Sequence, residues 1–172
     1  MLLSSITVRL RRLVLFMALV LVASAAASCT PERDPMDLRT AERTWLLNDA
    51  LACPPDYCRA EADMMSPAFD VAAHELAAAT RRAIQAQPRT LLLHAAEPGG
   101  RGQLVYQQRT PWAGFPDTIW IEFIPLDRTR STLAVYSRSD YGLLWDFGTN
   151  RDRVERWLGA IAAEITTESD GT

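Results

Sequence analysis

The sequence contains no lysine, only two histidines and only three cysteines, and all 18 of its basic residues are arginine. Acidic residues number 21, and the first 28 residues hold three arginines and no acidic residue. The chain beyond residue 28 therefore carries a net charge of −6, which argues against a nucleic-acid partner because nucleic acid requires a basic footprint. The same net negative charge argues against membrane binding through a polybasic segment that attracts anionic lipid.

Long apolar runs are scarce as well, and the longest lies near the N-terminus. The apolar and small-residue stretch Leu13–Ala27 would form a helix of about 22 Å, shorter than the ~30 Å hydrocarbon core of a bilayer. Three arginines precede this stretch. A basic head, an apolar core and a small-residue exit predict a cleavable secretory signal peptide over residues 1–28. A permanent membrane anchor is the alternative.

The odd number of cysteines needs an explanation in an exported protein. Ala26-Ala27-Ser28-Cys29 resembles a bacterial lipobox, in which the cysteine becomes the lipidated first residue of the mature chain, although Ala26 stands where leucine is usual. We therefore expect lipidation at Cys29, contact with the membrane through this N-terminal lipid anchor, and a location in a bacterial cell envelope facing the periplasm or the exterior. The alternative is ordinary cleavage of the signal peptide without lipidation, which would leave Cys29 as an unpaired thiol.

Lipidation of Cys29 would leave Cys53 and Cys58 as a pair, and an oxidising compartment favours a disulfide between them. Zinc held by these two cysteines with His74 or His94 is the alternative, but thiolate ligands compete poorly with oxidation in a cell envelope. We therefore predict a disulfide, no metal site and no cofactor, and we interpret both histidines as structural or surface residues.

The domain organisation follows from composition. We expect residues 29–49 to form a tether, residues 50–166 a single domain and residues 167–172 a polar tail. The 144 residues that follow the predicted signal peptide are enough for one domain with a hydrophobic core. Frequent prolines and charges up to residue 66 predict an irregular segment, pinned by the disulfide, at the start of the domain.

Two amphipathic helices are predicted, one on each side of a strand region. Residues 70–87 carry apolar side chains at helical spacing, with Asp70 as the expected N-cap and Pro88 as the stop. The second helix has one apolar stripe at positions i, i+3, i+4, i+7 and i+11, with Thr149 or Asn150 as the expected N-cap. The stripe consists of Val154, Trp157, Leu158, Ile161 and Ile165.

Four strands are predicted between the helices, over residues 90–95, 103–109, 118–126 and 131–138. The third is apolar on both faces, which indicates a central strand that is covered on both sides. Short connections favour an antiparallel meander. The expected fold is α+β, in the order helix, four strands, helix, with both helices packed on a four-stranded antiparallel sheet.

Two polar stretches stand out by their order and spacing. The first is Cys53-Pro54-Pro55-Asp56-Tyr57-Cys58, and the second is Ser137-Arg138-Ser139 followed by Asp146-Phe147-Gly148-Thr149-Asn150-Arg151-Asp152-Arg153. Together they resemble the domain of unknown function 1499 family of bacterial envelopes and plastids, over roughly residues 50–165. The resemblance implies no established activity, substrate or cofactor. A protein-kinase interpretation of Asp146-Phe147-Gly148 fails, because no glycine-rich loop, strand lysine or catalytic-loop motif accompanies it.

The residues best suited to a ligand site surround the predicted start of the final helix: Asp146, Asn150, Arg151 and Arg153. A helix N-terminus offers free N–H groups and partial positive charge, and two arginines beside it could complete a site for an anion or small ligand. In the alternative, which we favour, Asp146 pairs with Arg151 or Arg153 and Asn150 caps the helix, so that the cluster is structural.

An aromatic loop containing Trp112 and Phe115 separates the second and third predicted strands. Such a loop either folds back over the open end of the sheet core, which we favour, or contacts a partner or the membrane interface. The sequence as a whole predicts a non-catalytic envelope lipoprotein that is a binding or accessory module for a protein partner or a small apolar or anionic ligand. An enzyme of unknown reaction built around Asp146, Asn150, Arg151 and Arg153 is the alternative, and a purely structural accessory of an envelope complex is a third.

Overall fold

The structure is a computed structural model that describes residues 33–44, 47–96, 102–141 and 145–170. The predicted signal peptide and Cys29 lie outside the described residues. Residues 33–172 form one compact unit. None of the described helices combines the length and the apolar character that crossing a membrane requires.

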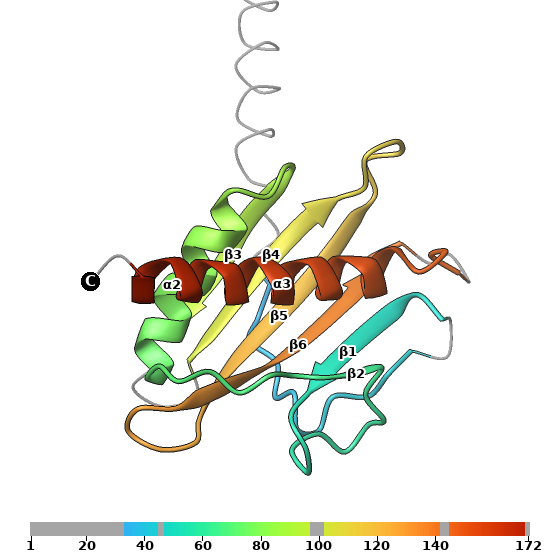
Figure 1. Ribbon diagram of the computed structural model, residues 1–172. Coiled ribbons are helices and arrows are strands. Elements are labelled where there is room, and N and C mark those ends of the chain that lie inside the picture. Colours follow the sequence, from blue (N-terminus) through green and yellow to red (C-terminus); the bar gives the residue numbers. More distant parts are fainter. Residues whose placement is uncertain (1–32, 45–46, 97–101, 142–144, 171–172) are drawn as a thin grey trace, which may run out of the picture. The chain divides into compact units, whose positions relative to one another are not determined.

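A six-stranded mixed sheet forms the centre of this unit, in the order β2-β1-β6-β5-β4-β3 (Figure 1). Every neighbouring pair is antiparallel except β1 and β2, which are parallel. The four predicted strands are confirmed as one antiparallel run, but the prediction of four strands was wrong because β1 and β2 extend the sheet beyond β6. The strands are β1 (Asp49–Cys53), β2 (Met64–Met65), β3 (Thr90–Ala96), β4 (Gln103–Arg109), β5 (Pro116–Pro125) and β6 (Ser131–Ser139).

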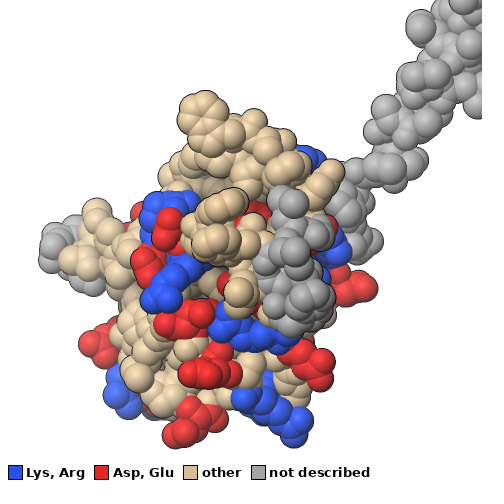
Figure 2. Space-filling model, turned by 90° about the vertical axis from the view of Figure 1, so that its right-hand side faces the viewer, with Lys and Arg blue, Asp and Glu red and all other residues tan. Residues whose placement is uncertain are grey.

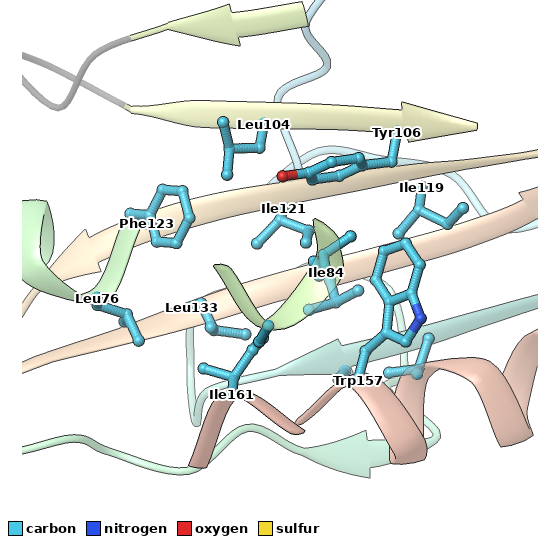
Figure 3. Packing of buried hydrophobic residues seen from close by; sticks show 14 of the residues in the cluster. Leu76, Ile84, Leu104, Tyr106, Ile119, Ile121, Phe123, Leu133, Trp157 and Ile161 are labelled. Carbon is cyan, nitrogen blue, oxygen red and sulfur yellow. The ribbon is translucent and has the colours of Figure 1, made fainter. Parts of the chain in front are cut away.

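The two predicted helices are confirmed, and both cover the same face of the sheet (Figure 1). Helix α2 spans Ala73–Gln85 and helix α3 spans Thr149–Asp170. Ala72, and not Asp70, is the N-cap of α2, and the Ala72 N–H donates to the Glu75 carboxylate at 3.0 Å. Helix α3 continues through most of the predicted polar tail. Figure 3 shows the side chains that the helices pack over the sheet, among them Leu76, Ile84, Trp157 and Ile161.

The opposite face of the sheet is covered by chain that has no regular secondary structure. Leu38 is fully buried there against a second apolar cluster that includes Trp120 and Tyr136. The backbone N–H and carbonyl of Met36 both bond to the Gln103 side chain, at 2.8 Å and 2.7 Å. The described residues 33–44, which fall within the stretch expected to be a tether, therefore pack against the sheet as part of the compact unit.

The disulfide between Cys53 and Cys58 is present, as predicted. It joins the end of β1 to the loop that follows. Within this loop the Tyr57 hydroxyl donates to the Glu122 carboxylate at 2.7 Å, and Glu122 also accepts the Leu38 N–H at 3.2 Å. Glu122 thus connects the disulfide loop to the segment around Leu38, and both belong to the cover on this face.

The register of the sheet brings several loops to one end. The last residue of β4, Arg109, pairs with the first of β5, and Asp117 on β5 pairs with Ser139 at the end of β6. Arg138 on β6 in turn pairs with Asp49 at the start of β1. The loops before β1, between β4 and β5, and after β6 therefore meet at the end of the sheet where α3 begins, on the right of Figure 1.

Candidate functional site

Asp146 caps the start of α3. Its carboxylate accepts the backbone N–H groups of Gly148 at 2.9 Å and Asn150 at 2.8 Å. The Thr149 hydroxyl donates to the Asp146 carbonyl at 2.6 Å. The prediction that Thr149 or Asn150 caps the helix was therefore wrong, since the side chain that accepts the free N–H groups comes from Asp146, ahead of the helix.

Asn150 ties this helix start to the sheet. It is fully buried, and its amide group donates to the Asp146 carboxylate at 2.6 Å and to the Asn48 carbonyl at 2.9 Å. Its amide oxygen accepts the Ser137 hydroxyl at 2.6 Å and an Arg153 Nη at 2.5 Å. Both polar ends of Asn150 are thereby satisfied, as the burial of an amide requires.

Arg153 lies at the centre of the network and is 2% exposed. Its Nε donates to the Gln108 side-chain oxygen at 2.7 Å, and one Nη donates to the Ser137 hydroxyl at 3.0 Å. Its other Nη donates to the carboxylate of Asp117, which is also buried. Burial raises the pKa of Asp117 and lowers the pKa of Arg153, while the attraction between the two charges opposes both shifts.

The structure brings together three of the four predicted site residues, Asp146, Asn150 and Arg153. The fourth, Arg151, is exposed and pairs with Glu155 one turn along α3, at 3.2 Å. The predicted pairing of Asp146 with an arginine was wrong. Asp146 caps α3 and binds Asn150, and the carboxylate that pairs with Arg153 comes from β5.

Sequence reasoning missed three members of the network: Gln108, Asp117 and Ser137. One signal for Asp117 was available, because an acidic residue at the start of an otherwise apolar strand needs a partner if it is buried. Ser137 stood in a stretch that carried the family resemblance, but nothing in the sequence indicated a role for it. Gln108 gave no signal at all.

The network is saturated by its own members. All three donor nitrogens of Arg153 are used, and so are both carboxylate oxygens of Asp146. Asp117 bonds to Ser139 in addition to Arg153. Such a network fixes the geometry of the helix start and the strand ends.

Aromatic side chains surround an apolar cavity beside this network. The Phe115 and Tyr141 rings stack with their centroids 4.4 Å apart, and those of Trp145 and Phe147 stack at 4.9 Å. Phe147 is 81% exposed although its φ of 56° is strained for a bulky residue. The cavity has a volume of ≈240 Å³. Its lining comprises Thr110, Pro111, Trp112, Ala113, Phe115, Asp117, Ser139, Trp145, Asp146, Phe147 and Thr149.

The aromatic loop has one ring that folds back and one that lies in solvent. Phe115 is partly buried and folds back onto Tyr141, whereas Trp112 is 99% exposed. The interpretation that we favoured, a loop that folds back over the open end of the sheet core, therefore fits Phe115 and does not fit Trp112.

A second cavity adjoins the first and has four arginines among its twelve lining residues. Its volume is ≈530 Å³, and the two cavities share Thr110, Pro111, Trp112 and Thr149. Arg89, Arg109, Arg153 and Arg156 line it, with Asp152 as the only acidic residue of its lining. Within the described part of the chain, Arg89, Arg109 and Arg156 form no ion pair with a carboxylate.

The remaining candidate ligands lie apart from this end. His74 on α2 is exposed, and His94 on β3 is partly buried. The described residues contain no group of three or more histidine, cysteine or acidic side chains placed to hold a metal ion. Cys53 and Cys58 are joined to each other, so they are not available as zinc ligands in this structure.

Comparison with known proteins agrees with the resemblance seen in the sequence. A family model described as "Protein of unknown function (DUF1499)" matches residues 29–161. The chain therefore belongs to this family. Neither the curated proteins nor the solved structures contain a match.

Proposed function

We propose that this member of the family is an exported, lipid-anchored and non-catalytic module of the cell envelope, and that it binds an anionic amphiphile. The single observation that carries the ligand class is the pair of adjoining cavities, one with four aromatic side chains in its lining and one with four arginines. The anchor is the lipid expected at Cys29, and the ligand site is the end of the sheet where α3 begins.

The two cavities match the two parts of an amphiphile. The aromatic cavity offers apolar walls, and ligand sites typically combine such walls with a few polar groups that fix orientation. Arg89, Arg109 and Arg156 add three positive charges to the second cavity against the one negative charge of Asp152. Guanidinium groups bind phosphate and carboxylate with two parallel hydrogen bonds. The alkyl chain of an amphiphile therefore fits the aromatic cavity, and its anionic head fits the second cavity.

The saturated network supports a binding role and not a catalytic one. The hydrogen bonds of the network join its members to one another and to the sheet, as those of Asp146, Asn150 and Arg153 show. A general base or nucleophile needs a lone pair that faces the substrate. We assign these residues to holding the cavity walls in place. We propose that Arg89, Arg109 and Arg156, which form no ion pair within the described residues, make the charged contacts with the ligand.

A titration with hexyl phosphate, which is short enough to stay in solution, tests this proposal on the full chain in phosphatidylcholine nanodiscs. Hexyl phosphate should bind at least tenfold more tightly than inorganic phosphate or hexanol, because only the complete amphiphile fills both cavities. Arg156→Gln should weaken binding about tenfold or more, as expected for the loss of a charge-assisted hydrogen bond.

Arg151→Gln is the matched control, since Arg151 is on the same helix but pairs with Glu155 outside both cavities. It should leave the affinity unchanged. Equal affinities of the Arg156→Gln and Arg151→Gln variants for hexyl phosphate would contradict the proposed site.

A further inference from the structure

Exposed apolar side chains concentrate at one end of the domain. We call the aromatic end the group formed by Trp112, Phe115, Tyr141, Trp145 and Phe147. Among the described residues, nine large apolar side chains are exposed, and four of them belong to this group, with exposed fractions of 99% for Trp112 and 60% for Trp145. An exposed apolar group of this kind marks an interaction surface when its members are contiguous.

The fold makes these residues contiguous. The loop between β4 and β5 carries Trp112 and Phe115, and the chain after β6 carries the other three. The pairing of Asp117 with Ser139 places those two loops side by side. Figure 2 looks onto the side where α3 begins, and there an uncharged area occupies the upper part of the described surface while most charged side chains lie below it.

The domain also begins at this end. Arg33, the first described residue, forms an ion pair at 2.8 Å with Asp140, which directly precedes Tyr141 in the sequence. The next residue, Asp34, accepts a hydrogen bond from the Trp120 indole at 3.1 Å through its carbonyl. Cys29 lies four residues before Arg33, and four residues of chain reach at most about 14 Å. A lipid on Cys29 therefore keeps Arg33, which is paired with Asp140, within about 14 Å of the lipidated residue.

We propose that the aromatic end docks on the lipid bilayer, with Trp112, Trp145 and Phe147 in the interfacial region. The anchor is the lipid on Cys29, so the docking rests on the proposed function in this respect. Tryptophan and tyrosine favour the membrane interface because their rings are apolar bodies with a polar edge. The backbone of Phe147 has a left-handed conformation, and its ring is largely exposed to solvent. Docking on the bilayer would remove this ring from water.

Apolar burial, and not charge, drives this docking. The chain beyond residue 28 has a net charge of −6, so anionic lipid offers it no general attraction. The aromatic end should therefore dock on zwitterionic phosphatidylcholine, and high salt should not release it. Trp112 lines both cavities, so docking would bring the walls of both cavities to the lipid surface.

Tryptophan quenching tests the docking directly. The full chain is reconstituted into phosphatidylcholine vesicles whose acyl chains carry bromine, which quenches tryptophan emission at short range. In the Trp112→Phe/Trp145→Phe variant, which keeps aromatic rings but removes two emitters, the quenched fraction of the emission should fall at least twofold. In the Trp157→Phe variant, which removes an emitter from the core, the quenched fraction should rise. An unchanged quenched fraction in the double variant would overturn the proposal.

A second pair of variants tests the contact itself. Phe147→Glu should reduce the quenching at least twofold, whereas Leu126→Glu, at an exposed position at the other end of β5, should leave it unchanged. Equal quenching in the two variants would overturn the docking. Flotation of the vesicles reports anchoring separately, and the hexyl phosphate titration reports ligand binding separately, so failure of the docking and failure of the proposed function give different results.

Discussion

The substitution Asp117→Asn should remove a large part of the stability of the domain. Arg153 is 2% exposed, and Asp117 is its counter-charge. An asparagine at this position keeps the shape but leaves the guanidinium buried without a negative partner. Removing one partner of a buried ion pair typically costs 3–5 kcal/mol. We expect a loss of about 4 kcal/mol in the free energy of unfolding, toward the middle of this range because Gln108, Ser137 and Asn150 still accept from Arg153.

Urea unfolding of the full chain in a mild detergent, followed by tryptophan emission, measures this loss. The matched control is Asp127→Asn, which breaks the exposed pair between Asp127 and Arg130 and should leave the free energy of unfolding nearly unchanged. The double variant Asp117→Leu/Arg153→Met removes both buried charges and should recover more than half of the loss seen with Asp117→Asn, because no unpaired charge remains. A loss below about 1 kcal/mol for Asp117→Asn would refute the central position of this pair.

Three further predictions follow from the fold and the site. Trp157→Ala should cost about 3–5 kcal/mol in urea unfolding, since Trp157 is fully buried between α3 and the sheet; a loss below about 1 kcal/mol would mean that α3 is peripheral. Asp146→Ala should cost about 1–2 kcal/mol, the range for a lost helix cap, and should weaken hexyl phosphate binding only through the loosened cavity wall; a loss of binding with intact stability would instead indicate a direct contact between Asp146 and the ligand. Hydrogen bonds from Arg130 and from the backbone of Thr129 lower the pKa of Asp127 to about 2, so the stability that Asp127 contributes is present above its unfolded pKa near 3.9 and is lost as the pH falls toward about 2. A pKa of Asp127 near 3.9 in an NMR titration would contradict this environment.

Periodic elements were predictable from the sequence because their burial follows a simple repeat. The stripe of α3 lies on one face of the helix, and Val154, Trp157 and Ile161 are all fully buried. Strand β1 lacked such a signal, since all five of its residues are buried and it contains two alanines and an aspartate. Its strand conformation depends on pairing with β6, which is distant in the sequence. Strand β2 has only two residues, too few for any period.

The candidate site was predictable only where its residues are close in the chain. Asp146, Asn150 and Arg153 fall within one helical turn and its cap, so their proximity could be read from spacing. Arg151 was included wrongly because two residues along a helix turn the side chain by about 200°, which directs Arg151 away from Arg153.

The strand residues of the network required the fold. Gln108, Asp117 and Ser137 come from three strands, and only the sheet register aligns them beneath α3. The two cavities could not be predicted from the sequence either, because three loops, together with strand and helix residues far apart in the chain, form their walls.

Native mass spectrometry of the full chain, extracted from its own membrane, tests the lipid anchor and the bound amphiphile in one measurement. We expect a mature protein that begins at an acylated Cys29 and retains a non-covalently bound anionic amphiphile. It also predicts that this bound mass is lost from the Arg156→Gln variant and kept by Arg151→Gln. A protein with no bound amphiphile, or with one that both variants retain equally, would contradict the proposed ligand site.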